Sequence, residues 1–291
     1  MKEAHIEVPA RDGFPLSVTF FEPSQDCGVV VVMHSATAVP RKIYTPFARA
    51  MAQRGAAVVT YDYRGIGESR PKSLKGFPAR MRDWARFDAP GVVDAALENW
   101  PGRKLYGVGH SYGGHAMGLM PDNQRQERIA MVAAQSGYWR LIAKRDQPRV
   151  WTLLNILGPA SVNLLGYVPG EHLGLGQDLP RGVFEEWRRW CMTPDYFFSD
   201  PTLDLLANFQ NVTAPVLAVG MSDDDWATPR AIEAFVRGFT ATKIERLTLT
   251  PEQAGVRKVG HLDFFRAQFA TTLWPTVIDW LLGRAATEGS L

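Results

Sequence analysis

The sequence has few cysteines and little net charge, and each shortage excludes a class of protein. Its two cysteines, Cys27 and Cys191, lie far apart and lack the spacing of a metal site. A reduced protein is the simpler interpretation, although one disulfide is compatible with the sequence. The 32 basic and 30 acidic residues leave a net charge of +2, which is too balanced to indicate a nucleic acid as the main partner.

Long hydrophobic runs and targeting signals are also missing. The longest aliphatic run, Val29–Met33, is much too short to span a bilayer. The first residues, Met1–Glu7, contain acidic side chains and no apolar stretch of the kind found in signal peptides. We therefore expect a cytoplasmic protein without a membrane span. The chain of 291 residues is 46% hydrophobic and 21% charged, so it can form one large globular core.

Strand and helix patterns alternate through most of the chain. Alternating apolar residues on both sides of Arg11–Gly13 predict an N-terminal antiparallel hairpin. Continuous apolar runs then predict strands that are covered on both faces. Such runs lie at 28–33 and 56–61. Further strands are predicted at 104–108, 128–134, 215–220 and 243–249, and helical patterns lie at 43–54, 88–100 and 274–282. This alternation predicts an α/β fold with a doubly wound, mostly parallel sheet.

The composition changes in the middle of the chain. Residues 138–211 are rich in Trp, Leu and Gly and lack the pattern of buried strands, while 183–192 has helical spacing. The strand–helix alternation then resumes. We therefore expect a core formed by residues 1–137 and 212–291, with 138–211 inserted as a helical cap. Such a cap would cover the carboxyl edge of the sheet, where open α/β sheets bind ligands.

The chemistry centres on the sequence Gly-His-Ser-Tyr-Gly at 109–113, which follows a strand pattern and precedes a helix pattern. This order is typical of a nucleophile elbow, in which a strained turn presents the serine, here Ser111. Glycine is expected at Gly109 and Gly113 because side chains there would collide with the neighbouring strand and helix. The backbone N–H of Tyr112 would lie at the helix N-terminus, where it can stabilise an oxyanion.

A serine hydroxyl needs a base, and the base needs a carboxylate that orients it. Where an elbow carries the serine, the acid and then the histidine follow it in the chain. Three aspartates, Asp223, Asp224 and Asp225, follow the strand after the insertion. His261 is the only histidine beyond them. The complete order is much more specific than any one of these motifs.

With these residues in place, the chain resembles the α/β-hydrolase fold family over nearly its whole length. More narrowly, it resembles bacterial serine hydrolases with a Tyr-Arg-Gly-Ile-Gly turn. The resemblance implies that Ser111 is the nucleophile and His261 the base. It also implies an acid four residues before a proline, which selects Asp225 ahead of Pro229, whereas counting three residues from the strand-end glycine selects Asp223. Matching segments are Asp62–Ser69, Gly109–Gly114, Ser136–Trp139 and Gly260–His261.

The resemblance also implies an oxyanion hole. Its donors would be the N–H groups of Tyr112 and Ala36, although the segment that begins at His34 lacks the glycine that is common in the family. No cofactor and no metal are implied. The expected activity is hydrolysis of a small-molecule carboxylic ester or thioester through an acyl-enzyme on Ser111, with Asp225 preferred as the acid.

Other interpretations stay open at this point. The same triad can serve an acyltransferase, an amidase or peptidase, or a C–C hydrolase, and the fold can host a non-catalytic small-molecule receptor. The aromatic residues of the cap suit its own core as well as a substrate pocket. The basic cluster of Arg140, Lys144, Arg145 and Arg149 is better interpreted as a solvated face than as an anion site. The oligomeric state is not encoded in any of these patterns.

Overall fold

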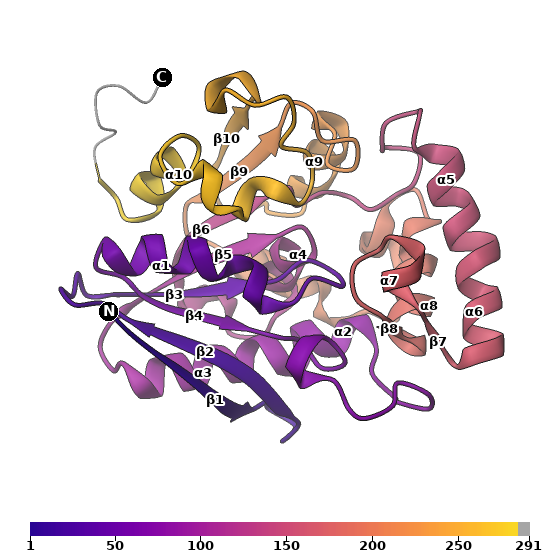
Figure 1. The fold of residues 1–291 in the computed structure, drawn as a ribbon, viewed down its shortest axis with the longest axis horizontal. Coiled ribbons are helices and arrows are strands. Elements are labelled where there is room, and N and C mark those ends of the chain that lie inside the picture. Colours follow the sequence, from indigo (N-terminus) through magenta and orange to yellow (C-terminus); the bar gives the residue numbers. More distant parts are fainter. Residues whose placement is uncertain (285–291) are drawn as a thin grey trace.

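Buried β-branched residues form an eight-stranded sheet through the centre of the molecule (Figure 1). The computed structural model describes residues 1–284. The strand order is β1-β2-β4-β3-β5-β6-β9-β10; β2 is antiparallel to both of its neighbours, and the other pairs are parallel. The predicted N-terminal hairpin and mostly parallel sheet are confirmed. The strands are β1 (Lys2–Pro9), β2 (Pro15–Glu22), β3 (Val29–His34), β4 (Ala57–Tyr61), β5 (Lys104–His110), β6 (Gln126–Val132), β9 (Val216–Met221) and β10 (Ile244–Leu249).

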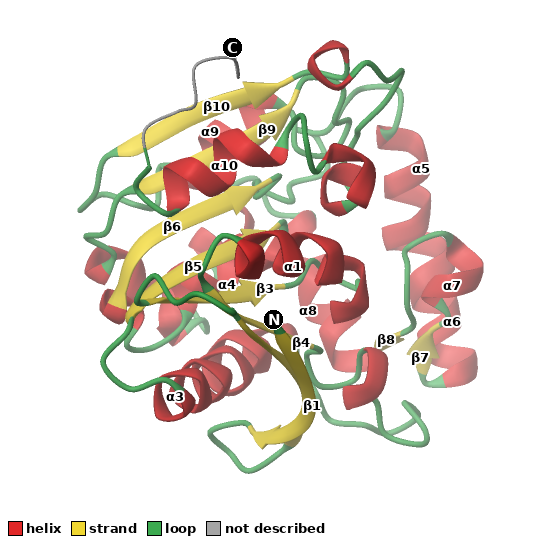
Figure 2. Cartoon of the chain, turned by 60° about the vertical axis from the view of Figure 1, so that its left-hand side comes forward, coloured by secondary structure: helices red, strands yellow, loops and turns green. Residues whose placement is uncertain are grey.

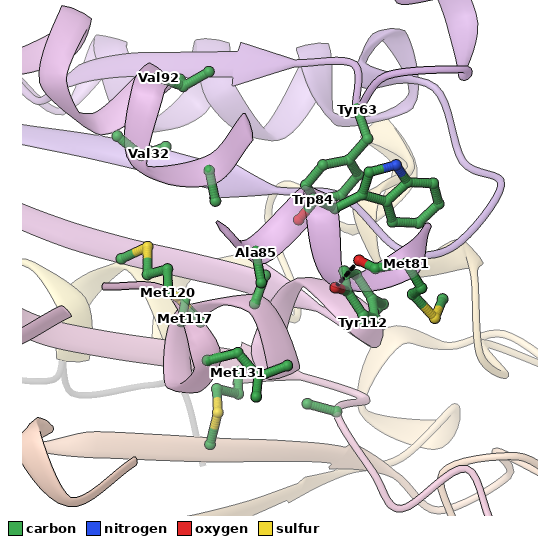
Figure 3. Packing of buried hydrophobic residues seen from close by; sticks show 14 of the residues in the cluster. Val32, Tyr63, Met81, Trp84, Ala85, Val92, Tyr112, Met117, Met120 and Met131 are labelled. Atoms are coloured by element: carbon green, nitrogen blue, oxygen red, sulfur yellow. Dashed lines mark hydrogen bonds between the residues drawn. The ribbon is translucent and has the colours of Figure 1, made fainter. Parts of the chain in front are cut away.

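Helices cover both faces of this sheet (Figure 2). Successive side chains of a strand point to opposite faces. Val31 accordingly packs in one apolar cluster with α1 and α10, while Val30 and Val32 pack in another with α3 and α4. Figure 3 shows part of the second cluster. The helices of the core are α1 (Thr45–Gln53), α2 (Met81–Asp83), α3 (Ala89–Asn99), α4 (Tyr112–Leu119), α9 (Pro229–Val236) and α10 (Trp274–Leu281).

Several helix ends follow signals that are visible in the sequence. A proline occupies the first turn of α1, α3 and α9, where its missing N–H costs no intrahelical bond. Thr228 caps α9 by accepting a hydrogen bond from the N–H of Ala231. The glycine after α1, Gly55, has a φ of +93°, which suits a helix stop. Within residues 1–284, no helix has the length and apolar character needed to cross a bilayer.

The segment 138–211, which we call the insertion, contributes no strand to the main sheet as the structure describes it. Its helices lie together at one side of the molecule (Figure 1). Val183 and Phe184 of α8 are buried in the same cluster as the core helices, which attaches the insertion to the core. The elements of the insertion are α5 (Gln147–Thr152), α6 (Gly158–Leu165), β7 (Tyr167–Val168), α7 (Gly170–Leu173), β8 (Leu179–Pro180) and α8 (Arg181–Cys191).

An ion pair also joins α8 to the core. The guanidinium of Arg82 in α2 donates to the carboxylate of Glu186 over 2.6 Å, and both side chains are buried. The same guanidinium lies 3.4 Å from Asp200. Removing one partner of a buried pair leaves an uncompensated charge, so this contact fixes where α8 sits.

Candidate active site

The predicted elbow is present at the end of β5. Ser111 has φ +50° and ψ −113°, a conformation that L-residues rarely adopt. A Cβ on Gly109 would lie 2.5 Å from backbone atoms of Gly113 and Gly114, and a Cβ on Gly113 would lie 2.0 Å from the carbonyl oxygen of His34. Both positions therefore require glycine because the neighbouring backbone lies too close for a side chain, as the sequence predicted. The strained turn places Ser111 directly before α4.

The structure brings His261 to this serine. Its Nε2 lies 3.1 Å from the Ser111 Oγ, so the hydroxyl can donate to the imidazole. The loop before His261 is held by Asp223, whose carboxylate accepts the N–H groups of Val259 and Gly260 over 2.9 and 3.0 Å. Gly260 has a φ of +61°, which sharpens the turn that carries the histidine.

The carboxylate that contacts His261 belongs to Asp224, and this corrects the preference for Asp225. The Oδ2 of Asp224 accepts from the His261 Nδ1 over 2.8 Å, and its Oδ1 accepts the N–H groups of Trp226 and Ala227 over 2.8 and 2.9 Å. Its side chain is fully buried. The proline rule failed because the loop turns one residue earlier than expected, so that the acid lies five positions before Pro229 instead of four.

Asp225 faces a different partner. Its carboxylate accepts from the Nη2 of Arg145 over 2.6 Å, and its carbonyl accepts the N–H of Ala143 over 2.8 Å. Asp225 therefore links the start of the insertion to the loop between β9 and α9 (residues 222–228), which we call the acid loop. Asp223, the alternative acid, forms no hydrogen bond with the imidazole within the described residues; its carboxylate braces the loop before His261 instead.

Two groups around the imidazole have shifted pKa values. The pKa of Asp224 lies below its ordinary value. Burial has the largest single influence and raises this pKa, but the charge of His261 and the hydrogen bonds that the carboxylate accepts together lower it by more. An ionised carboxylate at this place orients the imidazole and stabilises its charged form. His110, next to the serine, has its pKa lowered to about 3, mainly by burial, so it stays neutral at the pH values at which enzymes are assayed.

The two predicted oxyanion donors, the N–H groups of Tyr112 and Ala36, differ in whether another group already engages them. Tyr112 is the first residue of α4, and its backbone N–H has no acceptor within residues 1–284. Its side chain anchors this end of the helix by donating to the carbonyl of Met81 over 2.6 Å (Figure 3). The N–H of Ala36, in contrast, already donates to the hydroxyl of Tyr44 over 2.8 Å.

The backbone N–H of the next residue, Thr37, is not engaged in this way among the described residues. Thr37 lines the same cavity as Ser111, and within residues 1–284 its backbone N–H has no acceptor. The sequence could not separate Ala36 from Thr37, because the residue that engages Ala36 is the side chain of Tyr44, eight positions away. The missing glycine in this segment was the only local signal that the donor could shift by one residue.

Ser111 and His261 open into a cavity of about 340 Å³ between the core and the insertion. This volume is within the range of small-molecule sites. Both Arg149 and Lys258 also line it, and both are exposed at their positions. Within the described residues, no group of three or more His, Cys, Asp or Glu side chains is arranged to hold a metal ion. The cavity's apolar and aromatic lining residues include Leu175, Leu179, Trp187, Tyr196 and Trp226.

Comparison with known proteins agrees with the fold. Residues 24–165 match the family described as serine aminopeptidase, S33. None of the curated proteins matches the sequence. Among solved structures, DcsB in complex with its substrate analogue is similar, with a TM-score of 0.66 and 16% identity over 98% of this chain and 100% of that one.

Two further solved structures show the same likeness. One is Est1E from Butyrivibrio proteoclasticus with ferulic acid bound, with a TM-score of 0.63 and 16% identity over 97% of this chain and 100% of that one. The other is the esterase domain of a Rhodothermus marinus protein, with a TM-score of 0.59 and 16% identity over 97% of this chain and 99% of that one. The chain therefore has the α/β-hydrolase fold, as the resemblance implied.

Proposed function

We propose that this α/β hydrolase is a serine hydrolase that cleaves a small-molecule carboxylic ester or thioester through an acyl-enzyme on Ser111. The observation that carries the proposal is the hydrogen-bonded series from the Asp224 carboxylate through His261 to the Ser111 hydroxyl. The series ends at a cavity whose size suits a small molecule. It also supports the roles of nucleophile, base and acid for these three residues.

The proposed reaction has two halves. In the first, the Ser111 Oγ attacks the carbonyl carbon while the His261 Nε2 takes its proton, and the same proton then goes to the leaving alcohol or thiol. In the second, water attacks the acyl-enzyme by the same proton route and releases the carboxylic acid. Asp224 accepts the Nδ1–H throughout, which keeps the Nε2 lone pair toward the serine. The N–H groups of Tyr112 and Thr37 would stabilise the oxyanion of both tetrahedral intermediates.

The insertion would act as the cap that shapes the substrate site. Leu175, Leu179 and Trp187 belong to the insertion and line the cavity together with Trp226 of the acid loop. Trp187 and Trp226 are nearly parallel, with ring centroids 6.4 Å apart. These four side chains form an apolar and aromatic part of the lining, which favours an uncharged acyl group of moderate size there. Est1E, a neighbour of similar fold, binds ferulic acid, so aryl esters belong in the first substrate panel.

The test is hydrolysis of p-nitrophenyl esters of increasing acyl length, together with an aryl acyl ester and the matching amino-acid p-nitroanilides. We expect ester cleavage that falls by roughly 10⁴- to 10⁶-fold in Ser111→Ala, as in other triad knockouts. Preference for the anilides would replace the ester proposal with an amidase or peptidase. Equal rates for wild type and Ser111→Ala would refute the proposed mechanism.

A further inference from the structure

A buried tyrosine and a buried histidine connect two parts of the site behind Ser111. The N–H of Ala36 donates to the Tyr44 hydroxyl over 2.8 Å, and that hydroxyl lies 2.9 Å from the Nδ1 of His110. The Nε2 of His110 lies 2.8 Å from the carbonyl oxygen of His261. Tyr44 and His110 are each 1% exposed. We call this pair the Tyr44–His110 bridge.

The chemistry of these atoms fixes the direction of each hydrogen bond. A carbonyl oxygen can only accept, so the His110 Nε2 must carry the proton that is donated to His261. His110 is neutral because burial lowers its pKa to about 3, and its Nδ1 is therefore an acceptor. The Tyr44 hydroxyl must then donate to His110 while it accepts from Ala36. Every donor and acceptor along the bridge is satisfied in one arrangement only.

The bridge touches three segments that the proposed reaction needs. Ala36 belongs to the loop after β3, His110 directly precedes Ser111, and the His261 carbonyl belongs to the residue whose ring contacts the serine. Phe265 packs against both members of the bridge, with ring centroids 4.8 Å from Tyr44 and 5.1 Å from His110. The mechanism above uses neither Tyr44 nor His110, yet both sit at the junction of its parts.

We propose that Tyr44 and His110 are positioning residues. They hold the loop that carries His261, and the loop after β3 that carries Ala36 and Thr37, in place relative to Ser111. Tyr44 occupies the N–H of Ala36, which leaves the N–H of Thr37 for the substrate, and His110 fixes the backbone of His261. This inference rests on the proposed function, because it concerns the placement of the groups that carry out the reaction. A displacement of about 1 Å at such groups can cost about 100-fold in rate.

The first test compares Tyr44→Phe with Tyr61→Phe. Tyr61 is a matched control: its buried hydroxyl also lies 2.8 Å from the Nδ1 of a buried histidine, His34, which has no part in the bridge. Both variants should melt at lower temperature than wild type. We expect the kcat per reactive serine, counted by fluorophosphonate titration, to fall about 10- to 100-fold in Tyr44→Phe and to change less than twofold in Tyr61→Phe. KM should change little.

Two variants of His110 test the hydrogen bonds themselves. In His110→Gln the amide can still accept from Tyr44 and donate to His261, whereas His110→Leu removes both bonds. We expect the glutamine variant to keep most of the kcat that the leucine variant loses. A Tyr44→Phe protein with wild-type kcat per serine, or equal losses in the Tyr44 and Tyr61 variants, would overturn the positioning role.

A third measurement does not depend on turnover. Nitrogen NMR of histidine-labelled protein should show His110 as the Nε2–H tautomer, unchanged from pH 5 to pH 9, with its signals assigned by their loss in His110→Gln. A His110 that titrates in this range, or carries its proton on Nδ1, would overturn the bridge. A wild-type protein that neither reacts with the probe nor hydrolyses esters would refute the proposed function, and the role of the bridge in it, whatever the tautomer.

Discussion

Replacement of Asp224 by Asn is the most informative single change in the acid loop. The N–H groups of Trp226 and Ala227 both donate to its Oδ1, so the oxygen of an asparagine would be held at that position. The amide NH₂ would then face the His261 Nδ1, which would have to accept a hydrogen bond instead of donating one. The ring proton would move to Nε2, where it blocks proton transfer from Ser111.

This tautomer change should cost about 10⁴ in kcat, the loss that the same replacement causes in a related triad. The loss corresponds to about 5.4 kcal/mol of transition-state stabilisation. Asp225→Asn and Asp223→Asn are the matched controls on either side. The pair between Asp225 and Arg145 is at the surface, where Arg145 is 74% exposed, so its loss should leave kcat nearly unchanged.

Asp223→Asn should act on stability more than on rate. Its carboxylate accepts two backbone N–H groups of the loop before His261, and weakening such hydrogen bonds costs about 1–3 kcal/mol. The assay is kcat for ester hydrolysis by all three variants, each checked by thermal melting. An inactive, folded Asp225→Asn beside an active Asp224→Asn would refute the assignment drawn from the hydrogen bonds.

Three further predictions concern the frame of the site. Gly113→Ala should melt at lower temperature by the equivalent of about 1–3 kcal/mol or fail to fold, because its methyl group would lie 2.0 Å from the His34 carbonyl oxygen; an unchanged melting temperature would contradict this clash. Glu186→Gln should lower the free energy of unfolding in urea by about 3 kcal/mol, since Arg82 loses the nearer of its two buried acidic partners; a change below 0.5 kcal/mol, about the size of a surface effect, would show that the pair does not fix α8. The kcat/KM for an ester should rise with pH along a single limb, because a histidine base accepts a proton only in its neutral form and the buried His110 and His115 have pKa values near 3; a flat profile from pH 5 to 9 would exclude a histidine base.

The pKa of Asp224 determines how one contribution to folding stability changes with pH. Its pKa is lower in the folded protein than the ordinary value of 3.8, so its charged form stabilises the fold. This contribution is fully present above about pH 3.8 and is lost as the pH falls through the folded-state pKa. Asp224→Asn should therefore lose less stability than wild type on acidification, as measured by thermal melting at a series of pH values.

Sequence patterns predicted the sheet and the elbow because both depend on local order. Continuous apolar runs mark strands buried on both faces, and Gly109, Ser111 and Gly113 lie within one turn whose close contacts admit no other spacing. The place of His261 also followed from the sequence, because no other histidine comes after the acid loop. These features need no knowledge of distant side chains.

The acid and the second oxyanion donor could not be predicted in this way. Asp223, Asp224 and Asp225 carry the same side chain, so only the path of the turn decides which carboxylate points at the imidazole. That path depends on the N–H groups of Trp226 and Ala227 and on the capped start of α9. The N–H of Ala36 is likewise engaged by Tyr44, which is itself held by His110, 66 residues further along the chain.

The central claim is that Ser111 is a nucleophile activated by His261, and covalent labelling tests it most directly. Intact-mass spectrometry after treatment with a fluorophosphonate should show one adduct on wild type, mapped by peptide sequencing to Ser111. The Ser111→Ala protein should stay unmodified, and His261→Ala should react far more slowly. Equal labelling of wild type and Ser111→Ala, or an adduct at another residue, would contradict the account.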